Sequence, residues 1–292
     1  MKPEYDAASV QSLMLDDTHG PALELIHLPA GGPVPAQRGD PILMIHGAYT
    51  DAWSWAPTFM PFFAAHGHDV YALSLRGHGG SEGKAAINAW GLADFMKDMS
   101  RAQAHIGATP ILFGASMGGL LAQRWLTTGR DAVAVVTIGS IPPSGMTGAI
   151  LRMAWTQPRN LFEIAQVASS GTATRRFMRM LVEHPLRTGD GDFYRRHLTR
   201  ESSRALWELT WMPMVMPTRP ECPVLATQGE LDRMVPLDSL DVIERYFGAD
   251  RMVFPAMGHC PMLEKHWEEA ARRIGGWLDE RLYSEIDDEQ LD

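Results

Sequence analysis

The sequence predicts an α/β protein with a mostly parallel central sheet, flanked by helices and interrupted by a helical insertion. Short apolar runs alternate with amphipathic segments over residues 41–140 and again over 220–283. Most of these runs are continuously apolar, which is typical of strands buried on both faces. Alternation of such strands with helices indicates a parallel sheet covered by helices on both sides.

The first part of the chain supplies six expected strands of this sheet. Residues 12–17 and 22–29 are expected to form two strands joined by a His19-Gly20-Pro21 turn. The elements expected next are a strand at 41–47, a helix at 57–65, a strand at 69–75, a helix at 88–106, a strand at 109–115, a helix at 117–129 and a strand at 132–139.

Residues 141–219 interrupt this alternation. They carry no clear strand pattern, and repeated prolines divide them into short segments that we expect to be helices. We therefore expect a core formed by residues 1–140 and 220–292, with residues 141–219 inserted as a helical cap. The alternation resumes with a strand at 223–229, a helix at 238–246, a strand at 251–257 and a helix at 264–283, followed by an acidic tail.

The charge of the chain is unevenly distributed. The 292 residues carry a net charge of −9, which argues against nucleic acid as a partner. The segment 141–219 has 11 arginines, no lysine and 6 acidic residues, a net charge of +5 that leaves −14 for the rest. Two interpretations stay open: solvated helix faces docked on an acidic body, or a lid that attracts an anionic substrate or surface.

Cysteine content and hydropathy bear on the compartment. The chain has two cysteines, Cys222 and Cys260, too few for a disulfide framework or a metal cluster. The first residues do not have the apolar stretch of a signal peptide, and no apolar run approaches the roughly 18 residues that a membrane span needs. We expect a cytoplasmic protein without a membrane span and without a cofactor.

The clearest chemical signal is Ser116, in the stretch Gly114-Ala115-Ser116-Met117-Gly118. The serine lies between an apolar strand and a helix, where ligands bind in open α/β sheets. This is the placement of a nucleophile elbow, a sharp turn that presents a serine hydroxyl to its substrate. The alternative is a glycine-rich turn for close packing of helix on strand.

A serine nucleophile needs a histidine base, and the base needs a carboxylate that orients it. Asp232 and His259 each follow a late expected strand, in the order Ser, acid, His that is expected for this elbow. All three residues are therefore predicted at the same edge of the sheet. Glu230 and, more weakly, Asp250 are rival candidates for the acid.

Acyl transfer also requires hydrogen-bond donors for the oxyanion that develops on the substrate. The N–H of Met117, at the start of the helix, is one candidate. Ala48, in the loop after the strand at 41–47, is the second, although it could be an ordinary turn residue. His46 is interpreted as a structural residue beneath this loop.

In these motifs the chain resembles the α/β-hydrolase family. HGAYTDAW, LRGHGGSEG, GASMGG, GELDRMVP and GHCPMLE follow the family's order over residues 40–285. RGHGGSEG with SMGG is similar to monoacylglycerol lipase and lysophospholipase-like members. The resemblance implies that Arg76, Gly77, His78 and Gly79 form a structural loop and that Trp90 and Asp94 form a helix-packing pair. The chain departs from many relatives at Ser74, where they have Asp.

We expect a serine hydrolase of modest-sized hydrophobic carboxylic esters. The aromatic side chains expected to line its pocket are Trp53, Trp55, Trp155, Phe177, Trp207 and Trp211. The same triad would also serve a carbon–carbon bond hydrolase, lactonase, thioesterase or perhydrolase. From another class, a ligand receptor with this fold remains an alternative, distinguished by slow turnover and tight retention of ligand.

Overall fold

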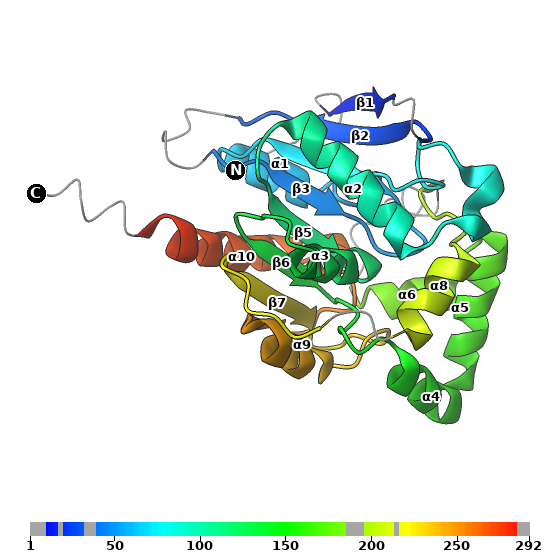
Figure 1. Ribbon diagram of the computed structural model, residues 1–292. Coiled ribbons are helices and arrows are strands. Elements are labelled where there is room, and N and C mark those ends of the chain that lie inside the picture. The colour runs from blue at the N-terminus through cyan, green and yellow to red at the C-terminus, as the bar shows by residue number, and fades with distance from the viewer. Residues whose placement is uncertain (1–9, 17–19, 32–38, 185–195, 213–215, 285–292) are drawn as a thin grey trace, which may run out of the picture.

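The central feature of the computed structural model is one eight-stranded sheet (Figure 1). The structure describes residues 10–16, 20–31, 39–184, 196–212 and 216–284. The strands lie in the order β1-β2-β4-β3-β5-β6-β7-β8, antiparallel from β1 to β4 and parallel from β4 to β8. Their bounds are Gln11–Leu15, Leu23–Leu28, Ile42–Ile45, Val70–Leu73, Ile111–Ala115, Val135–Ile138, Val224–Gly229 and Asp250–Phe254 for β1 to β8.

Helices cover the sheet on both faces, so successive strand residues enter two different cores. On β3, Ile42 and Met44 pack in the core beneath α1 and α10, whereas Leu43 and Ile45 pack beneath α2, α3 and α9. Burial of each such side chain stabilises the fold by about 1.5–3 kcal/mol. The helices are α1 Phe59–Ala65, α2 Leu92–Ile106, α3 Met117–Thr127, α9 Ser239–Phe247 and α10 Trp267–Leu282. None of the helices in the described part of the chain combines the length and apolar character needed to cross a membrane.

The segment between β6 and β7, which we call the insertion (residues 141–219), contains helices and irregular loops, and no strand among its described residues. Its helices are α4 Thr147–Thr156, α5 Pro158–Ser170, α6 Arg175–Leu181 and α8 Ser203–Trp211. Pro158 stands at the first position of α5, where its missing N–H has no helical partner to lose. The α4 helix packs against α5 and α8, and these helices gather at one end of the molecule (Figure 1).

Two expected helices begin later than the sequence pattern indicates. The segment expected as one helix at 88–106 is a 3₁₀ helix, Lys84–Ala89, followed by α2, because Gly91 is extended and caps the start of α2. The last helix is preceded by a separate 3₁₀ turn, Pro261–Leu263. Residues 17–19, which include His19 of the expected turn, and residues 285–292 of the acidic tail lie outside the described residues.

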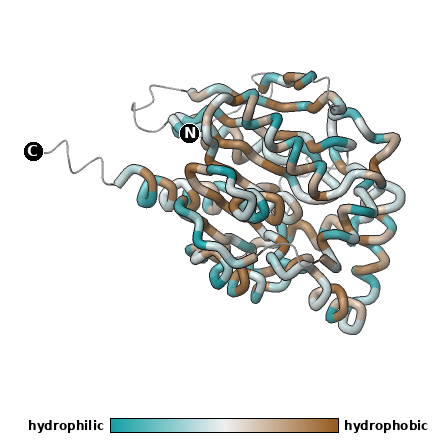
Figure 2. Tube along the Cα trace, in the orientation of Figure 1, coloured by the Kyte–Doolittle hydropathy of each residue, from teal (hydrophilic) through white to brown (hydrophobic). Residues whose placement is uncertain are grey.

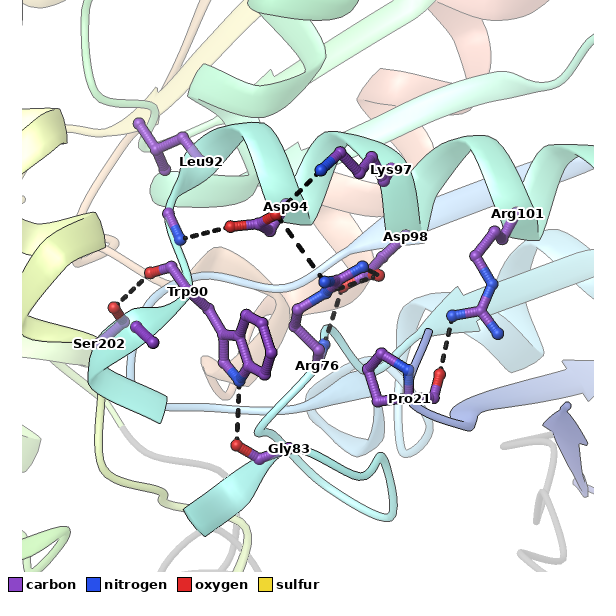
Figure 3. Close-up of polar contacts among 12 residues, drawn as sticks. Pro21, Arg76, Gly83, Trp90, Leu92, Asp94, Lys97, Asp98, Arg101 and Ser202 are labelled. Carbon is purple, nitrogen blue, oxygen red and sulfur yellow. Dashed lines mark hydrogen bonds and ion pairs between the residues drawn. The ribbon is translucent and has the colours of Figure 1, made fainter. Parts of the chain in front are cut away.

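The loop after β4 is held to α2 by a buried ionic contact (Figure 3). The guanidinium of Arg76 donates to both carboxylate oxygens of Asp98, with the shortest contact, Nη2 to Oδ1, at 2.6 Å. Arg76 also lies over the Trp90 ring and 3.9 Å from Asp94, whose other oxygen accepts the Gly91 N–H. These contacts fix the course of residues 76–79 towards the carboxyl edge of the sheet.

Candidate active site

Ser116 stands on a strained turn between β5 and α3. Its backbone has φ 50° and ψ −112°, a conformation that is uncommon for a residue with a side chain. The turn requires glycine at its flanks. A Cβ at Gly118 would lie 2.3 Å from the carbonyl oxygen of Ile45, and one at Gly114 would lie 2.3 Å from that of Gly118. Strain at Ser116 is therefore maintained by close packing of α3 against β3 and β5.

Asp232 and His259 meet beyond the carboxyl ends of β7 and β8. The Nδ1 atom of His259 lies 2.8 Å from Oδ2 of Asp232. Because the carboxylate accepts, Nδ1 carries the proton and Nε2 remains as the basic nitrogen. His259 is only 4% exposed, so this pair is shielded from competing water.

The carboxylate of Asp232 is itself held in place by three further donors. Its Oδ1 accepts the N–H groups of Met234 at 2.7 Å and Val235 at 2.9 Å. Its Oδ2 accepts from Nε2 of Gln228 at 3.1 Å. The carboxylate is thus oriented before any ligand binds, and it orients the imidazole in turn.

The rival acids are engaged elsewhere. Glu230 accepts the backbone N–H of Ala256 at 3.1 Å. Asp250 accepts from the Trp277 indole at 2.7 Å and lies 2.8 Å from the Arg281 guanidinium. Of the three candidate acids, Asp232 is the one that the structure pairs with His259.

Gly139, a residue that the sequence did not single out, makes room for this histidine. It follows β6 with φ +53°, and a Cβ there would lie 2.7 Å from the His259 carbonyl oxygen and 3.0 Å from its Nδ1. A glycine after an apolar strand is common in loops. The importance of Gly139 is therefore seen only once His259 is placed in space beside it.

Ser116 and His259 line the same hollow of about 40 Å³, together with Ala48. Ser116 and Ala48 also line a second, larger cavity of about 680 Å³. The serine therefore lies where the two spaces adjoin, with the histidine in the smaller one.

The two candidate oxyanion donors flank this position. Met117 is the first residue of α3, so its N–H has no intrahelical acceptor and lies at the positive end of the helix dipole. Ala48 is in the loop after β3, and within the described residues its N–H makes no hydrogen bond. His46 beneath this loop has Nδ1 2.7 Å from the Gly47 carbonyl oxygen, and its Nε2 accepts the Leu75 N–H. Burial, reinforced by neighbouring His78, lowers the pKa of His46 to about 3, so the ring is neutral.

The loop that carries Ala48 is clamped by the insertion. Tyr49 has φ 69°, which is strained for a residue with a ring. Its N–H donates to Oε2 of Glu201 at 3.1 Å, and its carbonyl oxygen accepts the Thr199 N–H at 2.8 Å. Two residues of the insertion therefore hold the residue next to Ala48.

Glu201 is a fully buried carboxylate that sequence reasoning missed. Its Oε2 also accepts from Nε2 of His78 at 3.1 Å, and its Oε1 accepts the Ser202 N–H at 2.7 Å. Burial alone would lower the pKa of His78, but the charge and hydrogen bond of Glu201 raise it above 6.5. Burial alone would raise the pKa of Glu201, but His78 and the backbone donors lower it below 4.5. The two side chains form an ion pair beside the cavity. No local pattern marks Glu201, since its partners are distant in sequence.

The larger cavity is lined mainly by aliphatic side chains of the insertion. They include Ile150 and Met153 of α4, Ile164 and Ala168 of α5, and Leu206 and Leu209 of α8. Polar groups at its wall include Glu201 and Arg200. The space that adjoins Ser116 is therefore predominantly apolar.

The six aromatic side chains expected in the pocket do not line this cavity. Trp55 and Phe177 are fully buried in the core, and Trp53 donates its indole N–H to Glu24. The other three face outward, with Trp155 90%, Trp207 57% and Trp211 50% exposed. Composition indicated that the insertion is rich in large apolar residues, but not which face of each helix carries them.

The comparisons with known proteins agree with this architecture. The family model for the alpha/beta hydrolase fold matches residues 40–266, and the chain belongs to this family. No curated protein matches the chain in sequence.

Solved structures of similar fold include several hydrolases. An esterase (EaEST) from Exiguobacterium antarcticum is 14% identical, with 92% of this chain and 100% of that chain covered and a TM-score of 0.72. The malate-bound esterase from Thermogutta terrifontis is 18% identical, with 93% and 99% covered and a TM-score of 0.66. A variant of the N-acyl homoserine lactonase AidH, complexed with N-hexanoyl homoserine, is 18% identical, with 94% and 98% covered and a TM-score of 0.70. At these identities the similarity establishes the fold.

Proposed function

We propose that this protein is a serine hydrolase that cleaves carboxylic esters of modest-sized hydrophobic substrates. The observation that carries the proposal is the 2.8 Å contact between His259 and Asp232, with His259 lining the same hollow as the strained Ser116. A serine, an oriented histidine and a buried carboxylate are the parts that acyl transfer requires.

The proposed reaction proceeds through an acyl-enzyme. Oγ of Ser116 attacks the ester carbonyl carbon while Nε2 of His259 takes its proton. The N–H groups of Ala48 and Met117 stabilise the oxyanion of the tetrahedral intermediate. As the intermediate collapses, the imidazolium gives the proton to the leaving alkoxide, and the alcohol departs.

Water completes the cycle. His259 removes a proton from a water molecule as the water attacks the acyl carbon, and it then returns that proton to Oγ of Ser116. Asp232 keeps the imidazole in the required tautomer and stabilises its positive form in both halves of the cycle. No cofactor takes part in these steps.

The cavity defines the proposed substrate class. A volume of about 680 Å³ with aliphatic walls accommodates a medium-length acyl chain or an aryl group. In this proposal the insertion acts as a cap, because its α4, α5 and α8 helices supply most of those walls. We also propose a cytoplasmic location, because both cysteines are free, as is usual in a reducing compartment.

The test is hydrolysis of p-nitrophenyl esters from acetate to dodecanoate by the wild type and by Ser116→Ala. The proposal predicts turnover with a chain-length optimum in the wild type and its loss in the variant. If no ester is turned over although the serine is reactive, the ester assignment is wrong. Lactone opening and carbon–carbon bond cleavage would then be assayed on the same two proteins.

A further inference from the structure

The outer surface of the insertion carries an unusual number of large apolar side chains. Seven of the ten exposed large apolar side chains among the described residues belong to it. Trp155 is 90% exposed, Phe162 69%, Leu151 61%, Trp207 57% and Trp211 50%. Single exposed apolar residues are ordinary, but a concentration of them on one segment indicates an interaction surface.

These side chains follow helical spacing. Leu151 and Trp155 are four residues apart on α4, and Trp207 and Trp211 are four residues apart on α8. The α4 helix packs against both α5, which carries Phe162, and α8. Figure 2 shows apolar stretches along these helices at the end of the molecule opposite the C-terminus. We call the exposed side chains of α4, α5 and α8 the apolar outer face.

The same helices are apolar on their inner side. Ile150 and Met153 of α4 line the large cavity, while Leu151 and Trp155 face outward. A helix at a water-facing surface normally places polar residues opposite its buried stripe. In α4, Arg152 is the one charged residue. Such a helix suits an environment that is apolar outside as well as inside.

Positive charge accompanies the apolar outer face. Residues 141–162 contain Arg152 and Arg159 and no acidic residue. Arg175 and Arg179 are exposed on α6, which packs against α5. Exposed tryptophan and phenylalanine together with arginine are characteristic of surfaces that lie in the headgroup region of a bilayer.

We propose that the apolar outer face docks on an anionic lipid surface. Trp155, Phe162 and Leu151 enter the headgroup boundary, and the arginines of α4, α5 and α6 contact lipid phosphates. The docking itself does not depend on the proposed esterase activity. In combination with that activity, it brings the walls of the cavity next to a phase in which hydrophobic esters dissolve.

A second copy of the chain is a poorer occupant. A symmetric dimer through this face would bring the Arg152 and Arg159 side chains of two copies towards each other, and residues 141–162 contain no acidic residue to offset them. Within the described part of the core, three large apolar side chains are exposed, Met14, Leu231 and Leu237, against seven on the insertion. An anionic lipid surface can both bury the exposed apolar side chains and pair the exposed arginines with negative charge.

The experiment is co-sedimentation of the Ser116→Ala protein with vesicles of phosphatidylcholine alone or of phosphatidylcholine with phosphatidylglycerol. The serine is removed so that vesicle lipid stays intact. We expect binding to the anionic vesicles that weakens at high salt, and at least tenfold weaker binding to the neutral ones. The double variant Trp155→Ser, Phe162→Ser should bind anionic vesicles at least tenfold more weakly. Arg159→Glu should also weaken this binding, and its effect should be larger at low salt than at high salt.

The matched controls lie on the core. Met14→Ser with Leu237→Ser removes two exposed apolar side chains, and Arg272→Glu reverses an exposed charge on α10. Neither should change binding. The proposal is overturned if the wild-type face binds neither kind of vesicle, or if the Trp155/Phe162 variant binds as tightly as its parent. It is also overturned if sedimentation in the absence of lipid shows a dimer that the same variant dissociates. Circular dichroism should show native folding for every variant, because the altered side chains are exposed.

Discussion

Glu201→Gln changes one buried charge and preserves the shape of the side chain, so it isolates the ion pair that links the insertion to the core. The carboxylate accepts from Tyr49, Ser202 and His78. A glutamine offers one acceptor oxygen, so its amide group opposes at least one of these donors. It also leaves His78 without a negative partner in a fully buried site.

The expected loss of stability follows from this geometry. Removing one partner of a buried pair costs about 3–5 kcal/mol, because the remaining charge is left uncompensated. Because folding raises the pKa of His78, the contribution of this histidine to stability is fully present below pH 6.5. It declines as the pH rises through the pKa that His78 has in the folded protein. Because folding lowers the pKa of Glu201, the contribution of this carboxylate to stability is fully present above pH 4.5 and declines as the pH falls. The cost of the substitution should therefore be largest between these two values.

Urea unfolding of the wild type and Glu201→Gln measures this cost. We expect a difference in unfolding free energy of about 3–5 kcal/mol at about pH 6 and a clearly smaller one at about pH 9, because the wild-type pair loses its charge as pH rises through the raised pKa of His78. Glu221→Gln, at an exposed position of the same chain, should change little at either pH. A difference below about 1 kcal/mol at pH 6, or one that grows with pH, would refute the assignment of a charged pair.

Three further predictions concern the candidate active site. Asp232→Asn should lower kcat by about 10⁴-fold, because the amide no longer selects the tautomer of His259; retention of more than a tenth of kcat for an active ester would contradict the role of this carboxylate. Gly139→Ala should displace His259, since the new Cβ would lie 2.7 Å from its carbonyl oxygen, and we expect kcat to fall about 10- to 100-fold while circular dichroism stays native. An unchanged kcat would show that the histidine loop adapts. Ala165→Trp should fill part of the cavity and shift the p-nitrophenyl ester optimum to shorter chains, whereas Trp207→Ala, at an exposed position, should leave that optimum unchanged.

Much of the fold follows from local patterns in the sequence. Continuous apolar runs identify β3 and β5, because strands buried on both faces need no polar residue. The positions of Ser116, Asp232 and His259 at one edge follow from the parallel order of the strands that precede them. Their catalytic roles remain predictions until activity is measured.

The contacts of Glu201 and Gly139 could not be read in the same way. Glu201 lies 152 positions from Tyr49 and 123 from His78 along the chain, so no spacing rule connects them. The prediction that aromatic residues of the insertion line the pocket was wrong for a related reason. Trp155 and Trp207 lie on short helices whose inner face is set by how α4, α5 and α8 pack together, and a count of tryptophans carries no information on that packing.

The proposed function depends on Ser116 acting as a nucleophile that His259 activates. Incubation with a fluorophosphonate, followed by mass spectrometry of the intact protein and its peptides, tests it without knowledge of the substrate. We expect one covalent adduct on the peptide that contains Ser116, absent in Ser116→Ala and strongly reduced in His259→Ala. Equal labelling of Ser116→Ala, or an adduct confined to another residue, would contradict it.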